Sequence, residues 1–198
     1  ASDNGPELWV LNGSDRRELM KHAYRIIREN GGLGEQVNNL ALKINSAWAR
    51  KPEVGANTHP ALVKEFVKQN KDAGVKNVVV PENPCNNPKW AFSRPGTQEA
   101  VEAAGGEMIN LRDNKKSCRE QKIPDGKSLK KAKVAEHFLN ADAVVNMPVA
   151  KHHGGAQLTI GMKNWMGAVL DRGFWHRNDL HQCIADFSTF LQADWTIV

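Results

Sequence analysis

Hydrophobic and polar positions along the chain alternate in blocks that predict strands and helices in turn. Residues 40–45 alternate apolar and polar side chains as a strand does, residues 60–73 repeat apolar side chains at helical spacing, and residues 75–80 form an almost continuous apolar run. A strand, a helix and a second strand in this order make two parallel neighbours joined by a right-handed crossover. The same patterns predict further strands at 8–11, 108–111, 141–147 and from 194 onward, and further helices at 15–30, 97–104, 159–170 and 178–192.

These elements predict an α/β protein with a mainly parallel sheet and helices on both of its faces, in three layers. The 198 residues suffice for one such domain, so we treat residues 1–198 as a single domain. The sequence stops at Val198, inside the strand that begins at residue 194. We therefore expect the domain to be incomplete at its C-terminus, and a further chain segment or a partner to cover this strand.

The net charge of +5 comes largely from one segment. Eight Lys and Arg residues but only two acidic residues lie between Lys115 and Lys133. No aromatic side chain interrupts them to stack on bases, so we expect an exposed, peripheral segment and do not expect nucleic acid as a partner. The sequence also has no run of the roughly 18 to 20 apolar residues that cross a bilayer, so we expect no membrane span.

Polar and titratable residues follow three of the predicted strands, each at the end where the strand finishes. Asn45 follows one strand, Cys85 comes shortly after another, and Lys151 and His152 come after a third. Ligands of open parallel sheets bind beyond the carboxyl ends of the strands. We therefore expect these side chains, with the rest of the loop at 82–85, to lie together at one edge of the sheet.

Two more polar residues interrupt the predicted helix at 159–170, whose other positions are largely apolar. These are Lys163 and Asn164. A lysine on an apolar helix must reach solvent, pair with an acid or meet an anionic ligand. Asn164 either caps a turn or binds the same ligand.

The first kind of site that fits these residues holds a small anion. Cations and amides would bind the anion, and a histidine would donate a proton to it. The catalytic candidates are Lys151, His152 and His176, and the ligand-binding candidates derived from placement are Asn45, Lys163 and Asn164.

The second kind of site holds a metal ion. His152 and His153 are adjacent and point to opposite sides of an extended segment, so at most one of them binds a given metal. His152 and His176, with Glu82 or Cys85 as a third ligand, would leave an open coordination position. A purely structural role also stays open, with the histidines hydrogen-bonded inside a packed loop.

Residues 144–176 carry a series of short motifs. They are Val-Val-Asn at 144–146, Lys-His at 151–152, Leu-Thr at 158–159, Lys-Asn at 163–164, Arg172 and His176. Together they resemble the domain of unknown function numbered 362, DUF362, and looser matches upstream include Lys43-Ile44-Asn45 and the segment from Asn57 to Pro60. The resemblance implies an α/β fold and a site, and it adds Thr58 and Arg172 to the ligand-binding candidates.

The family often occurs in iron–sulfur proteins, which suggests a redox partner. The four-cysteine ferredoxin insert of some members is absent from this sequence, and Cys85, Cys118 and Cys183 have no C-x-x-C spacing. We therefore expect no iron–sulfur cluster bound by this chain alone, while a metal ion stays open. The disulfide status of the three cysteines also stays open.

The function predicted from these features is a redox-linked enzyme acting on a small anionic metabolite. The alternative is a ligand-binding module without turnover. The sequence lacks the Rossmann, P-loop, nucleophile-elbow and H-E-x-x-H motifs, which disfavours nucleotide-dependent enzymes, α/β-hydrolases and zincins. The sequence begins at Ala1, without a Met, and residues 1–6 are polar or small. This start fits a chain whose signal peptide was removed, which implies a periplasmic location, and it equally fits a trimmed cytoplasmic chain.

Overall fold

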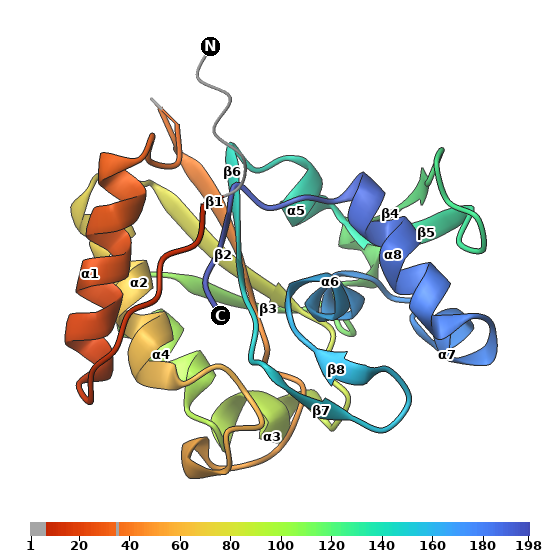
Figure 1. Ribbon diagram of the computed structural model, residues 1–198, viewed down its shortest axis with the longest axis horizontal. Coiled ribbons are helices and arrows are strands. Elements are labelled where there is room, and N and C mark those ends of the chain that lie inside the picture. The colour runs from red at the N-terminus through yellow and green to blue at the C-terminus, as the bar shows by residue number, and fades with distance from the viewer. Residues whose placement is uncertain (1–6, 35) are drawn as a thin grey trace.

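A computed structural model describes residues 7–34 and 36–198 of the chain; the N-terminal residues on which the signal-peptide expectation rests lie outside this part. In the described part, the centre is a sheet of five strands in the order β3-β2-β1-β6-β9, and every neighbouring pair is parallel (Figure 1). The predicted α/β class with a mainly parallel sheet is confirmed. The strands are β1 (Asn39–Ile44), β2 (Asn77–Glu82), β3 (Glu107–Asn110), β6 (Ala143–Met147) and β9 (Trp195–Thr196).

One face of the sheet is covered by helices that come early in the chain. Their apolar sides pack on Leu40, Leu42 and Ile44 of β1, because alternate residues of a strand point to the same face. Asp15 begins the first helix by accepting hydrogen bonds from the backbone of Arg17 and Glu18. The helices of this face are α1 (Arg16–Glu29), α2 (Pro60–Asp72) and α4 (Thr97–Glu102).

The opposite face is covered by short helices and a hairpin from the second half of the chain, which completes the three layers (Figure 1). Trp165, Trp175 and Phe187 form much of this apolar layer. A short helix α3 (Pro88–Ser93) and a second hairpin, β7 (Lys151–His153) with β8 (Gln157–Thr159), lie near the carboxyl ends of the strands. The covering elements are β4 (Cys118–Lys122), β5 (Lys131–Ala135), α5 (Glu136–Leu139), α6 (Gly161–Asn164), the 3-10 turn η3 (Trp165–Ala168), α7 (Gly173–Arg177) and α8 (Leu180–Phe190).

The strand order reverses at β1, which lies between β2 and β6. The chain builds β2 and β3 on one side of β1 and then returns to build β6 and β9 on the other. Loops that leave β1 and β6 therefore diverge at their carboxyl ends and open a crevice there.

Three predicted elements differ from the structure. Residues 8–11 form no strand, and the side chains of Leu8 and Val10 are 87% and 84% exposed, because this short run has no strand to pair with. Residues 159–170 form the end of β8, α6 and η3 in place of one helix, and the poor helix formers Gly161 and Gly167 lie in this stretch. The predicted helix at 178–192 begins at Leu180, where Asp179 caps it.

Most of the basic segment from Lys115 to Lys133 lies in the β4–β5 hairpin, which ends at Ala135. Its eight Lys and Arg side chains are all exposed, as expected. Val134 and Ala132 face the apolar layer instead, so the hairpin alternates buried and solvated positions. No helix of the described residues is long and apolar enough to cross a bilayer.

Candidate functional site

A cavity of about 220 Å³ lies beyond the carboxyl ends of β1 and β2 and beside the β7–β8 hairpin. We call it the carboxyl-edge cavity. Asn45, Cys85 and Lys151 line it together, as the strand order predicted, and Lys163 and Asn164 of α6 line it as well. The crevice at the reversal of the strand order is thus where these polar residues gather.

A buried ion pair forms the floor of this cavity. The Lys43 ammonium donates a hydrogen bond of 2.7 Å to Oε2 of Glu82, and the two side chains are 1% and 2% exposed. The backbone N–H of Ser46 donates to the same carboxylate oxygen at 3.2 Å. Burial lowers the pKa of Lys43, and the Glu82 carboxylate opposes that shift.

Asn164 ties this floor to two strands. Its Oδ1 accepts hydrogen bonds from Asn45 Nδ2 at 3.2 Å and from Lys43 Nζ at 3.4 Å. Its Nδ2 donates to Asn146 Oδ1 at 2.8 Å and to the backbone oxygen of Lys43. Because every polar atom of this buried amide is used, Asn164 fastens α6 to the carboxyl ends of the paired strands β1 and β6.

Two lysines extend the positive charge toward the cavity. Lys151 donates to Asn45 Oδ1 at 2.9 Å and to the backbone oxygen of Ala56. Burial, reinforced by the positive charge of Lys163, lowers the pKa of Lys151 to about 8. Burial also lowers the pKa of Lys163, whose ammonium has no hydrogen-bond partner within residues 7–34 and 36–198.

Thr58 and Arg172 have mainly positioning roles in this structure. The Thr58 hydroxyl accepts from the Asn45 backbone at 2.8 Å and donates to the Met147 backbone at 2.7 Å, so it ties the end of β1 to the end of β6. Arg172 lines the cavity and donates to the backbone oxygens of Asn83 and Pro84 at 2.6 and 2.7 Å.

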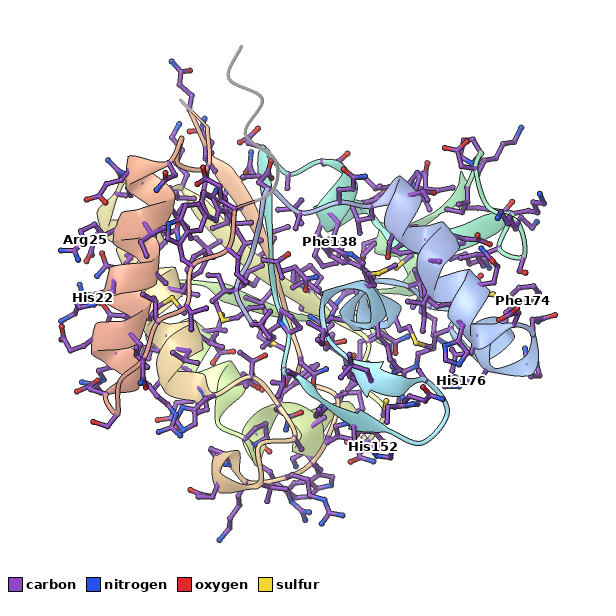
Figure 2. The ribbon with its side chains drawn as sticks, in the orientation of Figure 1. His22, Arg25, Phe138, His152, Phe174 and His176 are labelled. Atoms are coloured by element: carbon purple, nitrogen blue, oxygen red, sulfur yellow. The ribbon has the colours of Figure 1, made fainter. Side chains whose placement is uncertain are left out.

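The histidines are placed differently from the prediction. Side chains alternate along β7, so Lys151 and His153 face the cavity while His152 is exposed and does not line it. Figure 2 labels His152 and His176. His153 and not His152 stacks on His176, with ring centroids 6.3 Å apart. The sequence had shown that the two adjacent histidines point apart, but not which of them faces inward. The structure thus gives no support to His152 as a catalytic or metal-binding group of this cavity.

The surroundings of both inward-facing histidines favour their neutral form. Burial is the main cause that lowers their pKa values, and the Lys163 charge adds to it. His153 Nδ1 accepts from the backbone N–H groups of Gly155 and Ala156 at 3.1 and 2.9 Å, so its proton lies on Nε2.

The three residues expected to bind a metal do not converge. Cys85 and His176 line the cavity, but His152 points away from it. Nowhere in the described part of the chain do three His, Cys, Asp or Glu side chains gather closely enough to hold a metal ion. Cys85, Cys118 and Cys183 are all free thiols.

The candidate site residues chosen from the sequence leave out Lys43 and Gly167. Both lie in segments that resemble the family, but the resemblance gave neither of them a role. A buried lysine in the middle of a strand needs a buried acid as its partner. At Gly167, a Cβ would lie 1.9 Å from Glu82 Oε1 and 2.7 Å from Lys43 Nζ. Only glycine lets the backbone of η3 lie against the ion pair.

Comparison with known proteins identifies the family. The sequence profile of DUF362, a domain of unknown function, matches residues 40–198. The chain belongs to the DUF362 family. A thylakoid-associated protein of Synechocystis sp. is 22% identical to it over 163 residues, which are 80% of this chain and 49% of that protein.

Two solved structures share the fold. The lactate racemase apoprotein of Thermoanaerobacterium thermosaccharolyticum superposes with a TM-score of 0.58 at 15% identity, covering 88% of this DUF362 chain and 46% of that protein. A Thermotoga maritima protein gives a TM-score of 0.57 at 13% identity, covering 91% and 50%. The chain thus spans about half the length of the relatives it matches.

Proposed function

We propose that the carboxyl-edge cavity binds a small anion. The observation that carries the proposal is its charge: four cationic side chains line the cavity against a single carboxylate, that of Glu82. Charges withdrawn from water are costly unless they are paired. A bound anion would supply the missing negative charge. The four cations are Lys43, Lys151, Lys163 and Arg172.

The size of the cavity favours a small ligand. Its volume of about 220 Å³ is below the roughly 300 to 1,000 Å³ of ordinary drug-sized ligand pockets. A small carboxylate or a phosphate group suits this space, whereas a dinucleotide does not. Lys163 is the cation with the most to gain, because within the described residues no protein group accepts a hydrogen bond from it.

The cavity also holds groups suited to proton transfer at neutral pH. His176 is neutral there, and Lys151 has a pKa of about 8. A group whose pKa lies near the operating pH exchanges protons most effectively. We therefore propose an enzyme that moves a proton on a small anionic metabolite, with Lys151 and His176 as the acid–base pair.

A binding module without turnover is the second candidate. The observation in its favour is that Lys151 already donates to Asn45 and to the Ala56 backbone, so it is held as a fixed charge. Both candidates require anion binding, and only the enzyme changes the ligand. Incubating malonate or lactate with the protein in D₂O and following carbon-bound deuterium by NMR distinguishes them.

Anion binding itself is tested by titration calorimetry with malonate, phosphate and the uncharged malonamide. We expect the two anions to bind and malonamide not to bind. Replacing Lys163 by Gln removes one charge-assisted hydrogen bond and should weaken malonate binding by roughly tenfold or more. The matched control is Lys115→Gln, which makes the same charge change on an exposed side chain and should leave binding unchanged. Equal effects of the two substitutions would contradict the proposal.

A further inference from the structure

Glu82 is the one carboxylate among the described residues that line the cavity, and only one of its two oxygens accepts hydrogen bonds from described residues. Its Oε2 accepts from Lys43 Nζ and from the Ser46 backbone. Its Oε1 accepts no hydrogen bond from any described residue. A carboxylate oxygen in a side chain that is only 2% exposed needs a hydrogen-bond donor, which water or a ligand in the cavity would supply.

The position of this oxygen is fixed. Two donors hold Oε2, and the Glu82 side chain is 2% exposed, so the carboxylate cannot turn toward solvent. The backbone of Gly167 packs against one side of Oε1, because a Cβ at that residue would lie 1.9 Å from it, and Glu82 is among the residues that line the cavity. Oε1 is therefore a preorganised acceptor on the cavity wall.

An acceptor with a negative charge restricts which anions fit. A ligand carrying only carboxylate or phosphate oxygens meets repulsion at Oε1, even while the lysines attract it. A ligand with a hydroxyl or ammonium group next to its anionic group donates to Oε1 while its charge reaches the lysines. A site built to hydrogen-bond such a donor discriminates against the analogue that lacks it, because the acceptor is then left unpaired.

We propose that Glu82 Oε1 contacts the ligand, and that the ligand is a small anion with a hydrogen-bond donor on the atom next to its carboxylate or phosphate, such as a 2-hydroxy acid. This inference rests on the proposed anion site and narrows its ligand class. Lys43 acts as a positioning residue, since it holds Oε2 and so aims Oε1.

The test compares two probes that differ by one hydroxyl group, malonate and hydroxymalonate, by calorimetry on the unmodified chain. Both are dianions at neutral pH, so their attraction to the lysines is alike. A hydrogen bond to a charged acceptor predicts that hydroxymalonate binds about tenfold to a hundredfold more tightly. Equal affinities, or tighter binding of malonate, would overturn the role of Glu82 and leave the anion site standing. If neither probe binds, both the anion site and this inference are wrong.

A double variant ties the preference to Glu82. Changing Glu82→Gln alone would leave Lys43 buried without a counter-charge, so Lys43→Met is made with it to keep the pair neutral. The Gln oxygen still accepts from the Ser46 backbone, and its NH₂ then faces the cavity as a donor. We expect the double variant to bind malonate and to prefer hydroxymalonate by less than about threefold. If the full preference persists in a folded double variant, Glu82 is not its source.

Discussion

The two ends of the central sheet differ in what they bury. The carboxyl-edge cavity is small, about 220 Å³, and its wall contains the buried Lys43–Glu82 pair. A larger hollow of about 770 Å³ lies at the amino ends of β1 and β2, and we call it the amino-edge hollow. Among the described residues, its lining has two charged side chains, Arg28 and Lys76, and both are exposed.

Volume and buried charge therefore favour opposite ends of the sheet. The described lining of the amino-edge hollow includes glycines such as Gly31 and Gly32, and a buried polar side chain there is an amide, that of Asn70. Charges cost far more to bury than amides do. The concentration of buried charge, and not the size of the opening, is why we propose the carboxyl edge as the ligand site.

The largest difference between the two edges is expected in the loss of stability when a buried polar side chain is replaced by an apolar one. Lys43→Met leaves Glu82 buried without its partner and should lower the free energy of unfolding by about 3 to 5 kcal/mol. Asn70→Leu at the amino edge removes an Oδ1 that has no partner in the described structure and one hydrogen bond from Nδ2 to the Phe66 backbone oxygen. The two effects oppose each other, so stability should change by less than about 1 kcal/mol. Urea unfolding of both variants measures the two changes, and similar values would remove the distinction.

The second largest difference in stability is expected between alanine substitutions of two glycines, one at each edge. Gly167→Ala should cost about 2 to 3 kcal/mol, because its Cβ would force the ion pair apart. Gly31→Ala at the amino edge meets no atom within 4 Å, and only its φ of +94° opposes a side chain, at about 1 kcal/mol. Thermal unfolding should rank the two variants in this order. The reverse order would show that the ion pair tolerates being moved.

The pH dependence of malonate binding tests whether the charge of Lys151 contributes to the carboxyl-edge cavity. Its ammonium loses its proton near pH 8, so malonate affinity should fall by about tenfold between pH 7 and pH 10. In Lys151→Met the fall should be clearly smaller, and calorimetry at several pH values measures it. An unchanged pH profile in the variant would show that another group titrates.

The stability of the unliganded protein should change with pH in the opposite sense. The pKa of Lys151 is lowered in the folded state, so between about pH 8 and its ordinary value of 10.5 the unfolded chain holds more protons. Stability from this residue therefore rises with pH across that window, because raising the pH favours the state that binds fewer protons. Unfolding of Lys151→Met over the same range should lack this rise.

The smallest effect is expected on the exposed hairpin. Lys131 and Glu120 form an ion pair of 3.0 Å there, with side chains 65% and 53% exposed. Glu120→Gln should change stability by less than about 0.5 kcal/mol, since water screens both charges. A loss near that of Lys43→Met would mean that charge itself, and not its burial, controls stability here.

Much of the fold could be predicted from the sequence, because the spacing of apolar residues differs clearly between the strands and the helices. The patterns predict a strand at β1, a helix at α2 and a strand at β2. This order predicts that β1 and β2 pair in parallel, as they do. Their order then placed Asn45, Cys85 and Lys151 at one edge, where the structure has them.

The remaining errors have physical causes. Three-residue strands such as β7 are too short to show which of their side chains face inward. The sequence analysis therefore chose His152 as the site histidine, whereas His153 lines the cavity. The stretch at 159–170 has helical spacing, but Asn164 and Gly167 are fixed by contacts with distant residues that no local pattern shows. Tertiary contacts of this kind override local propensity.

The central claim is that the carboxyl-edge cavity is the anion site of this DUF362 chain. The most direct test is anomalous diffraction from crystals soaked in bromide, which locates an anion without assuming its identity. The account predicts a strong bromide peak in the cavity, beside the Lys163 ammonium. Bromide found only in the amino-edge hollow or along the lysines of the β4–β5 hairpin, with water alone in the carboxyl-edge cavity, would contradict it.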